Sequence, residues 1–147
     1  MMIHEFRKVT IVRLRKPTQK DLNQDLQWFS SSLGLFSERD KEKSCFRIFV
    51  ELIKAARRNQ PLNSDQIALR THLSRATIIH HLNKLIETGL VIPHEGSYIL
   101  RVDNLETLVE EVKRDVLRSF EDLQAMAEEL DDQLGLIKRS RTKVLSD

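Results

Sequence analysis

Two adjacent histidines, His80 and His81, stand in the middle of residues 72–90, which read HLSRATIIHHLNKLIETGL. Paired imidazoles can ligate a metal ion, exchange protons as an acid and a base, or contact DNA. Adjacent side chains on a helix point about 100° apart, whereas metal ligands on one helix are best spaced by three or four residues. The spacing therefore disfavours a metal site. We expect His81 to be half-buried against the preceding helix, while His80 is open to a structural or a DNA-binding role.

Other reactive side chains are sparse. The single cysteine, Cys45, excludes an internal disulfide and a zinc site made of several cysteines. The sequence contains no glycine-rich phosphate loop, no nucleophile elbow and no clustered set of carboxylates with a histidine. We therefore expect no catalytic residues, no metal and no cofactor, and we expect that the protein is not an enzyme.

The residues around the two histidines predict a helix that begins after Ser74 and ends before Gly89. Serine is a favoured N-cap and glycine a favoured stop. Ile78, Leu82 and Leu85 repeat at spacings of four and three, so they share one face, which we expect to be buried. The remaining circumference is largely polar or basic, of the residue types that bond to phosphates and base edges, with no carboxylate in its first half.

Two further helices precede this one and a hairpin follows it. The run SCFRIFVELIKAARR, residues 44–58, is apolar on two sides, which indicates a helix central to the core. NQPLN breaks it, and Ser64 is expected to cap a second helix, DQIALRTHL. After Gly89, the runs LVIP and YILRV flank the polar HEGS, which predicts two short strands around a turn. Helix, helix, turn, helix and hairpin in this order predict a winged helix-turn-helix.

Residues 62–102 carry a specific resemblance to a known family. LSRATIIHHLNKLIETGLV is similar to the recognition-helix segment of ArsR-like winged-helix transcription regulators, which tends to read Leu-Ser, then Val-Ser-His-His-Leu, and later Gly-Leu-Val. The matching residues are Leu73, Ser74, Ile78, His80, His81, Leu82, Leu85, Gly89, Leu90 and Val91. The resemblance implies a regulator whose outward helix residues enter the major groove of DNA and whose wing contacts the backbone or the minor groove.

Carried over residue by residue, the resemblance places the expected DNA contacts of the helix at Ser74, Arg75, Thr77, Ile79, His80, Asn83 and Lys84. On the wing, the expected contacts are His94, Ser97 and Arg101. Ile79 departs from the small polar residue usual at its position, and it packs either on a thymine methyl group or against another part of the protein. The Cys-X-Cys pair and the Asp/His sets of metal-sensing members are missing from this sequence.

The first 36 residues lie outside the resemblance. EFRKVTIVRLR, residues 5–15, is β-branched and basic and predicts a strand that ends at Pro17. Thr18 is then expected to cap a helix that Gly34 ends. The apolar face of that helix is expected to comprise Leu22, Leu26, Phe29 and Leu33. The basic residues of the strand are open to two interpretations, a second DNA contact or the solvent face of an edge strand.

Residues 104–136 contain no proline, and no glycine until Gly135, and they predict about nine turns of amphipathic helix. The residues expected to form its dimerisation stripe are Val109, Val112, Val116, Phe120, Leu123, Met126 and Leu130. Pairing with a second copy of the helix, giving a homodimer, is the leading interpretation. Packing back on residues 18–58 and docking of a different protein are the other two. The stripe is irregular at Ser119, so a helical bundle is favoured over a strict two-stranded coiled coil.

Charge is unevenly distributed along the chain, although the net charge is only +2. Residues 1–102 have a net charge of +7, residues 103–132 of −8, and residues 133–147 of +3. A basic body favours double-stranded DNA as partner. The acidic long helix favours an alternative function, a winged-helix interaction module that recruits a partner protein through this helix.

The expected fold is mainly α, a winged helix-turn-helix with a two-stranded wing. We expect an N-terminal strand–helix extension at 1–36, the DNA-binding domain at 37–102, the dimerisation helix at 103–137 and a flexible basic tail at 138–147. No apolar run approaches the roughly 20 residues that span a bilayer, so we expect a cytoplasmic protein without membrane contact. The expected function is sequence-specific regulation of transcription by a dimeric repressor, whose effector the sequence does not identify.

Overall fold

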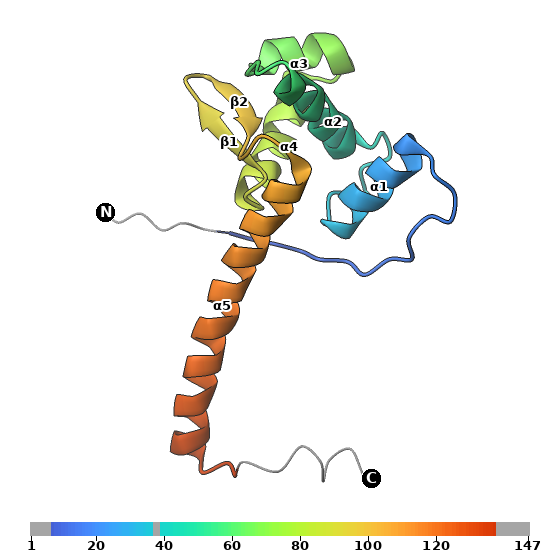
Figure 1. Cartoon of the computed structure of the whole chain (residues 1–147). Coiled ribbons are helices and arrows are strands. Elements are labelled where there is room, and N and C mark those ends of the chain that lie inside the picture. The colour runs from blue at the N-terminus through green and yellow to red at the C-terminus, as the bar shows by residue number, and fades with distance from the viewer. Residues whose placement is uncertain (1–6, 37–38, 138–147) are drawn as a thin grey trace. The chain divides into compact units, whose positions relative to one another are not determined.

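The computed structural model describes residues 7–36 and 39–137 (Figure 1). Its elements in chain order are α1 (Leu22–Ser32), α2 (Ser44–Arg57), α3 (Ser64–Thr71), α4 (Arg75–Glu87), β1 (Val91–His94), β2 (Ser97–Leu100) and α5 (Leu105–Leu134). The chain divides into two compact units, Met1–Val112 and Lys113–Asp147, which are described separately below. The described part is mainly helical with one two-stranded antiparallel sheet as a wing, which confirms the predicted winged helix-turn-helix.

The core of the first unit lies where α2, α3, α4 and the hairpin meet. α2 contacts α4, α3 and β2, which makes it central to the core, as its two apolar sides predict. Arg47 of α2 also donates a hydrogen bond to the backbone oxygen of Thr71 at the end of α3. The largest fully buried side chains are Phe49, Leu35, Ile48, Leu52, Leu62, Ile67, Ile78, Leu82, Leu85, Leu90, Leu108 and Val91. This shared core fixes the orientation of α4.

The ends of α3 and α4 follow local capping chemistry. Asn63 caps α3 and forms a capping box with Gln66, in which each side chain accepts from the other residue's backbone N–H at 2.8 Å. The prediction that Ser64 caps this helix was wrong, because Gln66 is correctly spaced for Asn63, and Ser64 is the first helical residue. Ser74 caps α4 as predicted. Gly89 follows its C-cap, Thr88, with a φ of +82°.

The wing is a short hairpin in which Val91 pairs with Leu100 and His94 pairs with Ser97. Positive φ values at Glu95 (48°) and Gly96 (80°) make its two-residue turn, a geometry that suits the right-handed twist of the strands. Leu62 and Tyr98 exchange backbone hydrogen bonds of 3.1 and 2.8 Å, which attach the hairpin to the loop before α3.

The predicted N-terminal strand is absent from residues 7–15, and residues 5 and 6 lie outside the described part. β-branched residues favour an extended backbone, but a strand also needs a neighbouring strand, and residues 7–15 pair with none. Residues 7–16 instead form an extended segment, here called the strap, blue in Figure 1. Lys8 N donates to the backbone oxygen of Glu87 (3.0 Å), and Val12 N donates to that of Ser32 (2.8 Å). The strap thus joins α4 to α1.

α1 begins later than predicted. Its N-cap is Asp21, whose carboxylate accepts a hydrogen bond from Asn23 N at 3.1 Å, so the prediction of Thr18 was wrong. Thr18 is three residues too early, since residues 18 and 19 form a bend. Leu22 is exposed, while Leu26, Phe29 and Leu33 are half-buried. Gly34 follows the helix with a φ of +72°, which a glycine adopts without strain.

α5 begins after Asn104, whose side chain accepts from Thr107 N at 2.8 Å. Within the first unit it buries Leu108 (0% exposed) and Val112 (4%). Val112 therefore differs from its predicted place on a dimerisation stripe, because its side chain is enclosed by its own chain. No described helix combines the length and the apolar character that crossing a membrane requires.

From Lys113 onward, α5 presents apolar side chains to solvent. Those spaced by four and three are Val116, Phe120, Leu123, Ala127, Leu130 and Leu134, here called the α5 stripe. Phe120 is 61% exposed and Leu123 is 64% exposed. Met126 lies beside the stripe and is 54% exposed. Val116 at the start of the stripe is half-buried, and the stripe residues from Phe120 to Leu134 are exposed.

Candidate nucleic-acid interface

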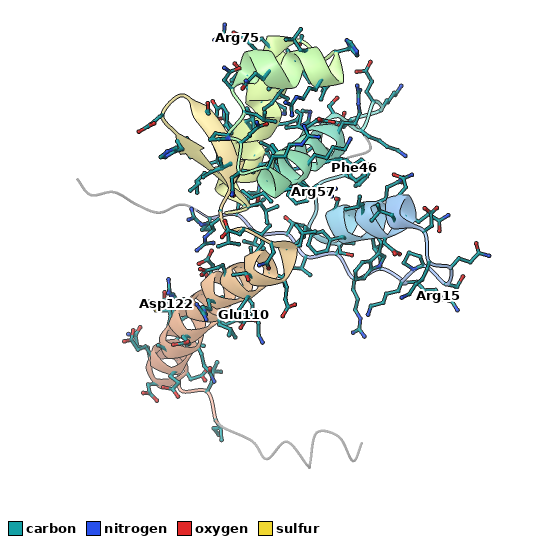
Figure 2. The ribbon with its side chains drawn as sticks, turned by 45° about the horizontal axis from the view of Figure 1, so that its top comes forward. Arg15, Phe46, Arg57, Arg75, Glu110 and Asp122 are labelled. Carbon is teal, nitrogen blue, oxygen red and sulfur yellow. The ribbon has the colours of Figure 1, made fainter. Side chains whose placement is uncertain are left out.

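α4 separates an apolar face from a polar one. Ile78, Leu82 and Leu85 are fully buried, as predicted. On the opposite side Ala76, His80, Asn83 and Glu87, spaced by four, three and four, are exposed. Arg75, labelled in Figure 2, is exposed at the first position of the helix. The outward face therefore carries an imidazole and an amide before its single carboxylate at Glu87, and the guanidinium of Arg75 is exposed at the start of the helix.

The first turn of α4 is locked by a pair of hydroxyl groups. Ser74 Oγ accepts a hydrogen bond from Thr77 N at 3.2 Å and donates one to Thr77 Oγ1 at 2.8 Å. Ser74 is exposed and Thr77 is half-buried. Ser74 and Thr77, both predicted DNA contacts, therefore also stabilise the N-terminus of α4. Arg75 projects from this turn.

Ile79 and Lys84 lie on the flanks of the outward face, and both are half-buried. Part of the Ile79 side chain is covered by the protein itself, and part remains accessible. Lys84 stands between two grooves that run beside α4, and it lines both of them.

The first groove, here called the loop groove, has a volume of about 670 Å³ and separates α4 from residues 39–44. Its lining includes Arg39, Lys41, Ala76, Thr77, His80 and Lys84. The second, here called the strap groove, has a volume of about 550 Å³ and is lined by Lys8, Thr10, Leu33, Gly34, His80, Asn83, Lys84, Glu87 and Thr88. Sequence reasoning missed Lys41 as a neighbour of α4, because only the tertiary fold brings its loop there.

His81 packs inside the protein rather than outward. Its Nε2 lies 3.8 Å from Asp40 Oδ2, and each side chain is 12% exposed. His81 is half-buried as expected, but its partner Asp40 belongs to the loop before α2, whereas the sequence predicted packing against α3. Asp40 Oδ2 also accepts from Cys45 N at 3.0 Å, so it satisfies a backbone donor at the start of α2. The ring of His81 meets that of His80 edge-on, with centroids 5.0 Å apart.

Burial and charge set the protonation of this cluster. Burial lowers the pKa of His81 below 6.5, and the carboxylate of Asp40 acts in the opposite direction. Burial also works to raise the pKa of Asp40, but backbone hydrogen bonds from Ser44 and Cys45 outweigh it and hold this pKa below 3.8. Burial raises the pKa of the Cys45 thiol to about 11, so the thiol is protonated and unreactive at neutral pH.

The wing brings together two of its three predicted contacts. His94 and Ser97 face each other across the hairpin, and the side chain of His94 is 55% exposed. Arg101 lies apart from them, at the base of the wing. Its Nη2 is 3.8 Å from Glu111 Oε2 of α5, and its side chain is only 19% exposed. Arg101 therefore contacts α5 and lies several residues away from the tip of the wing.

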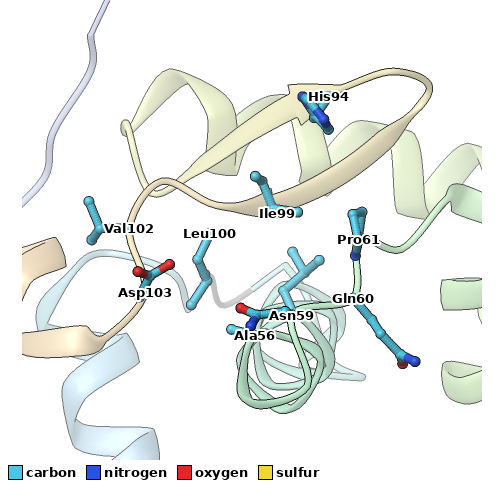
Figure 3. A pocket seen from close by; sticks show the side chains of 10 residues that line it. Ala56, Asn59, Gln60, Pro61, His94, Ile99, Leu100, Val102 and Asp103 are labelled. Atoms are coloured by element: carbon cyan, nitrogen blue, oxygen red, sulfur yellow. The ribbon is translucent and has the colours of Figure 1, made fainter.

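Two further hollows lie away from the outward face of α4. One, of about 210 Å³, is formed by the end of α2, residues 59–61 and the hairpin (Figure 3). Its lining includes Ala56, Asn59, Pro61, Ile99 and Asp103. The other, here called the α2–α3 groove, is lined by Glu51, Lys54, Ala55, Arg57, Arg58 and Arg70. Neither shares a lining residue with α4. In residues 7–36 and 39–137, no three His, Cys, Asp or Glu side chains gather as candidate metal ligands.

Comparison with known proteins identifies one similarity. Residues 50–92 match the family model of the bacterial regulatory proteins of the arsR family. This span runs from within α2 to β1 and contains all of α3 and α4. Neither the curated proteins nor the solved structures gave a significant match to the chain. The match confirms the ArsR-like resemblance over this segment, and it supports a DNA-binding regulator of transcription.

Proposed function

We propose that this ArsR-like winged helix-turn-helix is a sequence-specific transcription regulator that binds double-stranded DNA as a homodimer. The observation that carries the proposal is the exposed side of α4, with Arg75 at the start of the helix and His80 and Asn83 on its outward face, while the other side is fixed in the core. A rigid helix with exposed donors and acceptors suits the major groove, which is wide enough to admit it. Repression is the simplest outcome, because a protein that occupies its site blocks access to it.

Each side chain has a chemical role in the proposed complex. Arg75 and Lys84 carry the positive charge that attracts phosphates or the acceptor atoms of guanine. His80 and Asn83 supply hydrogen bonds to base edges, and asparagine suits adenine. Glu87 lies at the C-terminal end of the helix, so its negative charge is distant from the first turns of α4. On the wing, His94 and Ser97 are the proposed backbone contacts, while Ser74, Thr77, Ile79 and Arg101 border the surface.

A binding experiment with charge-matched variants tests this face. In vitro selection from random duplexes first identifies a preferred site, and fluorescence anisotropy then measures affinity at about 50 and about 200 mM salt. Arg75→Ala with Lys84→Ala removes two cations, and each phosphate contact contributes about 0.9 to the slope of log affinity against log salt. The wild type loses affinity between the two salt concentrations, and this loss should be about 12-fold smaller in the double variant. Lys54→Ala with Arg58→Ala removes two cations from the α2–α3 groove and should change this loss much less. Equal effects of the two pairs would refute α4 as the reading helix.

The homodimer rests on the α5 stripe. The stripe runs for about 27 Å of helix from Val116 to Leu134, estimated at 1.5 Å per residue. From Phe120 to Leu134 its side chains are exposed in one copy, and an exposed apolar surface of this kind marks an interaction site. A second copy of the same helix offers a complementary apolar surface, which gives a closed two-fold assembly. Two recognition helices then fit a roughly palindromic site with half-sites about 34 Å apart.

Full-length variants test the dimer better than a truncation after residue 102, which would remove the buried Leu108 and Val112 from the core. Leu123→Gln with Leu130→Gln should give monomers in analytical ultracentrifugation. The control, Glu121→Gln with Glu128→Gln, introduces the same side chain on the opposite face of α5 and should remain dimeric. A stripe variant that stays dimeric would contradict the homodimer. The acidic helix would then be available to a different protein, as in the alternative interaction module.

A further inference from the structure

The strap is the most basic stretch of the described chain. Residues 7–16, RKVTIVRLRK, contain five Lys or Arg and no Asp or Glu. Its backbone is extended and pairs with no strand. A cationic solvent face on an edge strand would explain such a sequence without any ligand, but that explanation requires a sheet that residues 7–15 do not join. The charge of the strap therefore needs another explanation.

The strap is held in place rather than free. Hydrogen bonds fix it at three points, from Lys8 N to Glu87 O (3.0 Å), from Val12 N to Ser32 O (2.8 Å) and from Trp28 Nε1 to Leu14 O (3.2 Å). The ammonium group of Lys16 lies 5.8 Å from the centre of the Trp28 ring, within the range of a cation–π contact. These contacts order the backbone in advance, which lowers the entropy lost when a ligand binds it.

The cationic side chains of the strap face solvent. Lys8, Arg13, Arg15 and Lys16 are all exposed, and Figure 2 labels Arg15 on the strap beside α1. Within the described residues, Arg13 and Arg15 make no ion pair. Their charge is therefore available to an external anion.

The strap also borders the outward face of α4. Lys8 and Thr10 form one wall of the strap groove, and His80, Asn83 and Lys84 of α4 form the other. A duplex that lies against α4 would meet the strap next. The α2–α3 groove is also basic, but it shares no lining residue with α4, so it lacks this continuity.

We propose that the strap is a second DNA-binding surface, whose exposed cations contact backbone phosphates that flank the bases facing α4. The inference rests on the proposed function, because it assumes that α4 lies in the major groove. Phosphate contacts add affinity and fix the register of the protein on the duplex, but they carry no sequence information themselves. The strap should therefore strengthen binding to the selected site and to an unrelated duplex by similar factors.

A triple variant tests the proposal in the full-length protein. Arg13→Gln, Arg15→Gln and Lys16→Gln remove three exposed cations. If each contacts a phosphate, the slope of log affinity against log salt should fall by about 2.7, so the loss between about 50 and about 200 mM salt should shrink by about 40-fold. The control variant, Lys54→Gln with Arg57→Gln and Arg58→Gln, removes the same charge from the α2–α3 groove. An unchanged slope in the strap variant, or an equal change in the control, overturns the proposal.

A shortened duplex and the single tryptophan provide a second readout. Trp28 is the only tryptophan in the chain, and it contacts Leu14 and Lys16 of the strap. A duplex with long flanks should change the fluorescence of Trp28, whereas one trimmed to the selected core should not. The trimmed duplex should also bind the wild type and the strap variant equally. Identical fluorescence with both duplexes overturns the proposal. A wild type that binds no DNA at all instead refutes the proposed function.

Discussion

Replacing Gly34 by alanine should destabilise the protein more than the same change at a comparable but open glycine. Gly34 has a φ of +72°, and a Cβ added there would lie 2.8 Å from Thr10 Cβ and 3.1 Å from Thr10 O. The carbonyl oxygen belongs to the backbone, so it cannot rotate away as a flexible side chain could. The strap must therefore shift to accommodate the methyl group.

Gly96 provides the matched control. Its φ is +80°, and nothing lies within 4 Å of a Cβ built there. Gly96→Ala therefore introduces the strain of the left-handed region alone, at a cost of about 1 kcal/mol. Gly34→Ala carries the same strain together with the collision at Thr10, so the difference between the two variants measures the collision.

The size of that difference follows from what the strap must release. If residue 10 moves outward, the nearby hydrogen bond from Val12 N to Ser32 O is the first to be lost. One such bond contributes about 1 kcal/mol, so Gly34→Ala should cost about 2 kcal/mol in total. Thr10→Gly in the Gly34→Ala background removes the nearest contact atom and should recover part of the loss.

Urea unfolding followed by circular dichroism measures both variants, and the slope of free energy against urea should stay constant. The expected ranking is wild type, then Gly96→Ala, then Gly34→Ala in order of decreasing stability. If Gly34→Ala is no less stable than Gly96→Ala, the strap does not lie against residue 34, and its position beside α4 loses support.

Two further predictions concern the core of the first unit and its dependence on pH. Leu82→Ala should lower the free energy of unfolding by about 3 kcal/mol because Leu82 is fully buried. Leu69→Ala, at a side chain that is 77% exposed, should change it by less than about 0.5 kcal/mol, and similar losses in a urea titration would contradict the packing described. Because the pKa of His81 is lowered in the folded state, the unfolded chain takes up its proton first as pH falls through 6.5. The free energy of unfolding should therefore decline below that pH until the folded pKa of His81 is reached. Urea titrations on either side of pH 6.5 should show a smaller decline for His81→Gln than for the wild type. An identical decline in both proteins would contradict the burial of His81.

The elements around α4 were predictable because their signals are local. The spacing of Ile78, Leu82 and Leu85, with Ser74 before them and Gly89 after, defines a helix and its buried face within one short stretch. The hairpin follows from two apolar runs around a turn that contains Gly96. Each of these signals depends on residues that are close in sequence, so no knowledge of the tertiary fold is needed.

The features of the structure that the sequence did not predict depend on partners distant in sequence. The β-branched strap favours an extended backbone, but only the fold decides whether a neighbouring strand is present. Arg101 is basic in sequence, yet its contact with Glu111 becomes visible only when α5 is placed. Val112 continues an apolar spacing that is shared by core and surface positions, and the body of its own chain encloses it. For the N-cap of α3 the sequence offered two adjacent candidates, Asn63 and Ser64, and both residue types cap helices.

Because the strap is attached to Glu87, the number of residues in α4 also determines where the strap is held. Glu87 is the last residue of the helix, and its carbonyl accepts the hydrogen bond from Lys8 N. One inserted residue would move that carbonyl about 1.5 Å along the helix axis and rotate it by about 100°. Insertions or deletions between Ser74 and Glu87 would therefore misalign the N-terminal segment even where they preserved a helix. We expect that length to vary less among relatives with a basic N-terminus than among relatives without one.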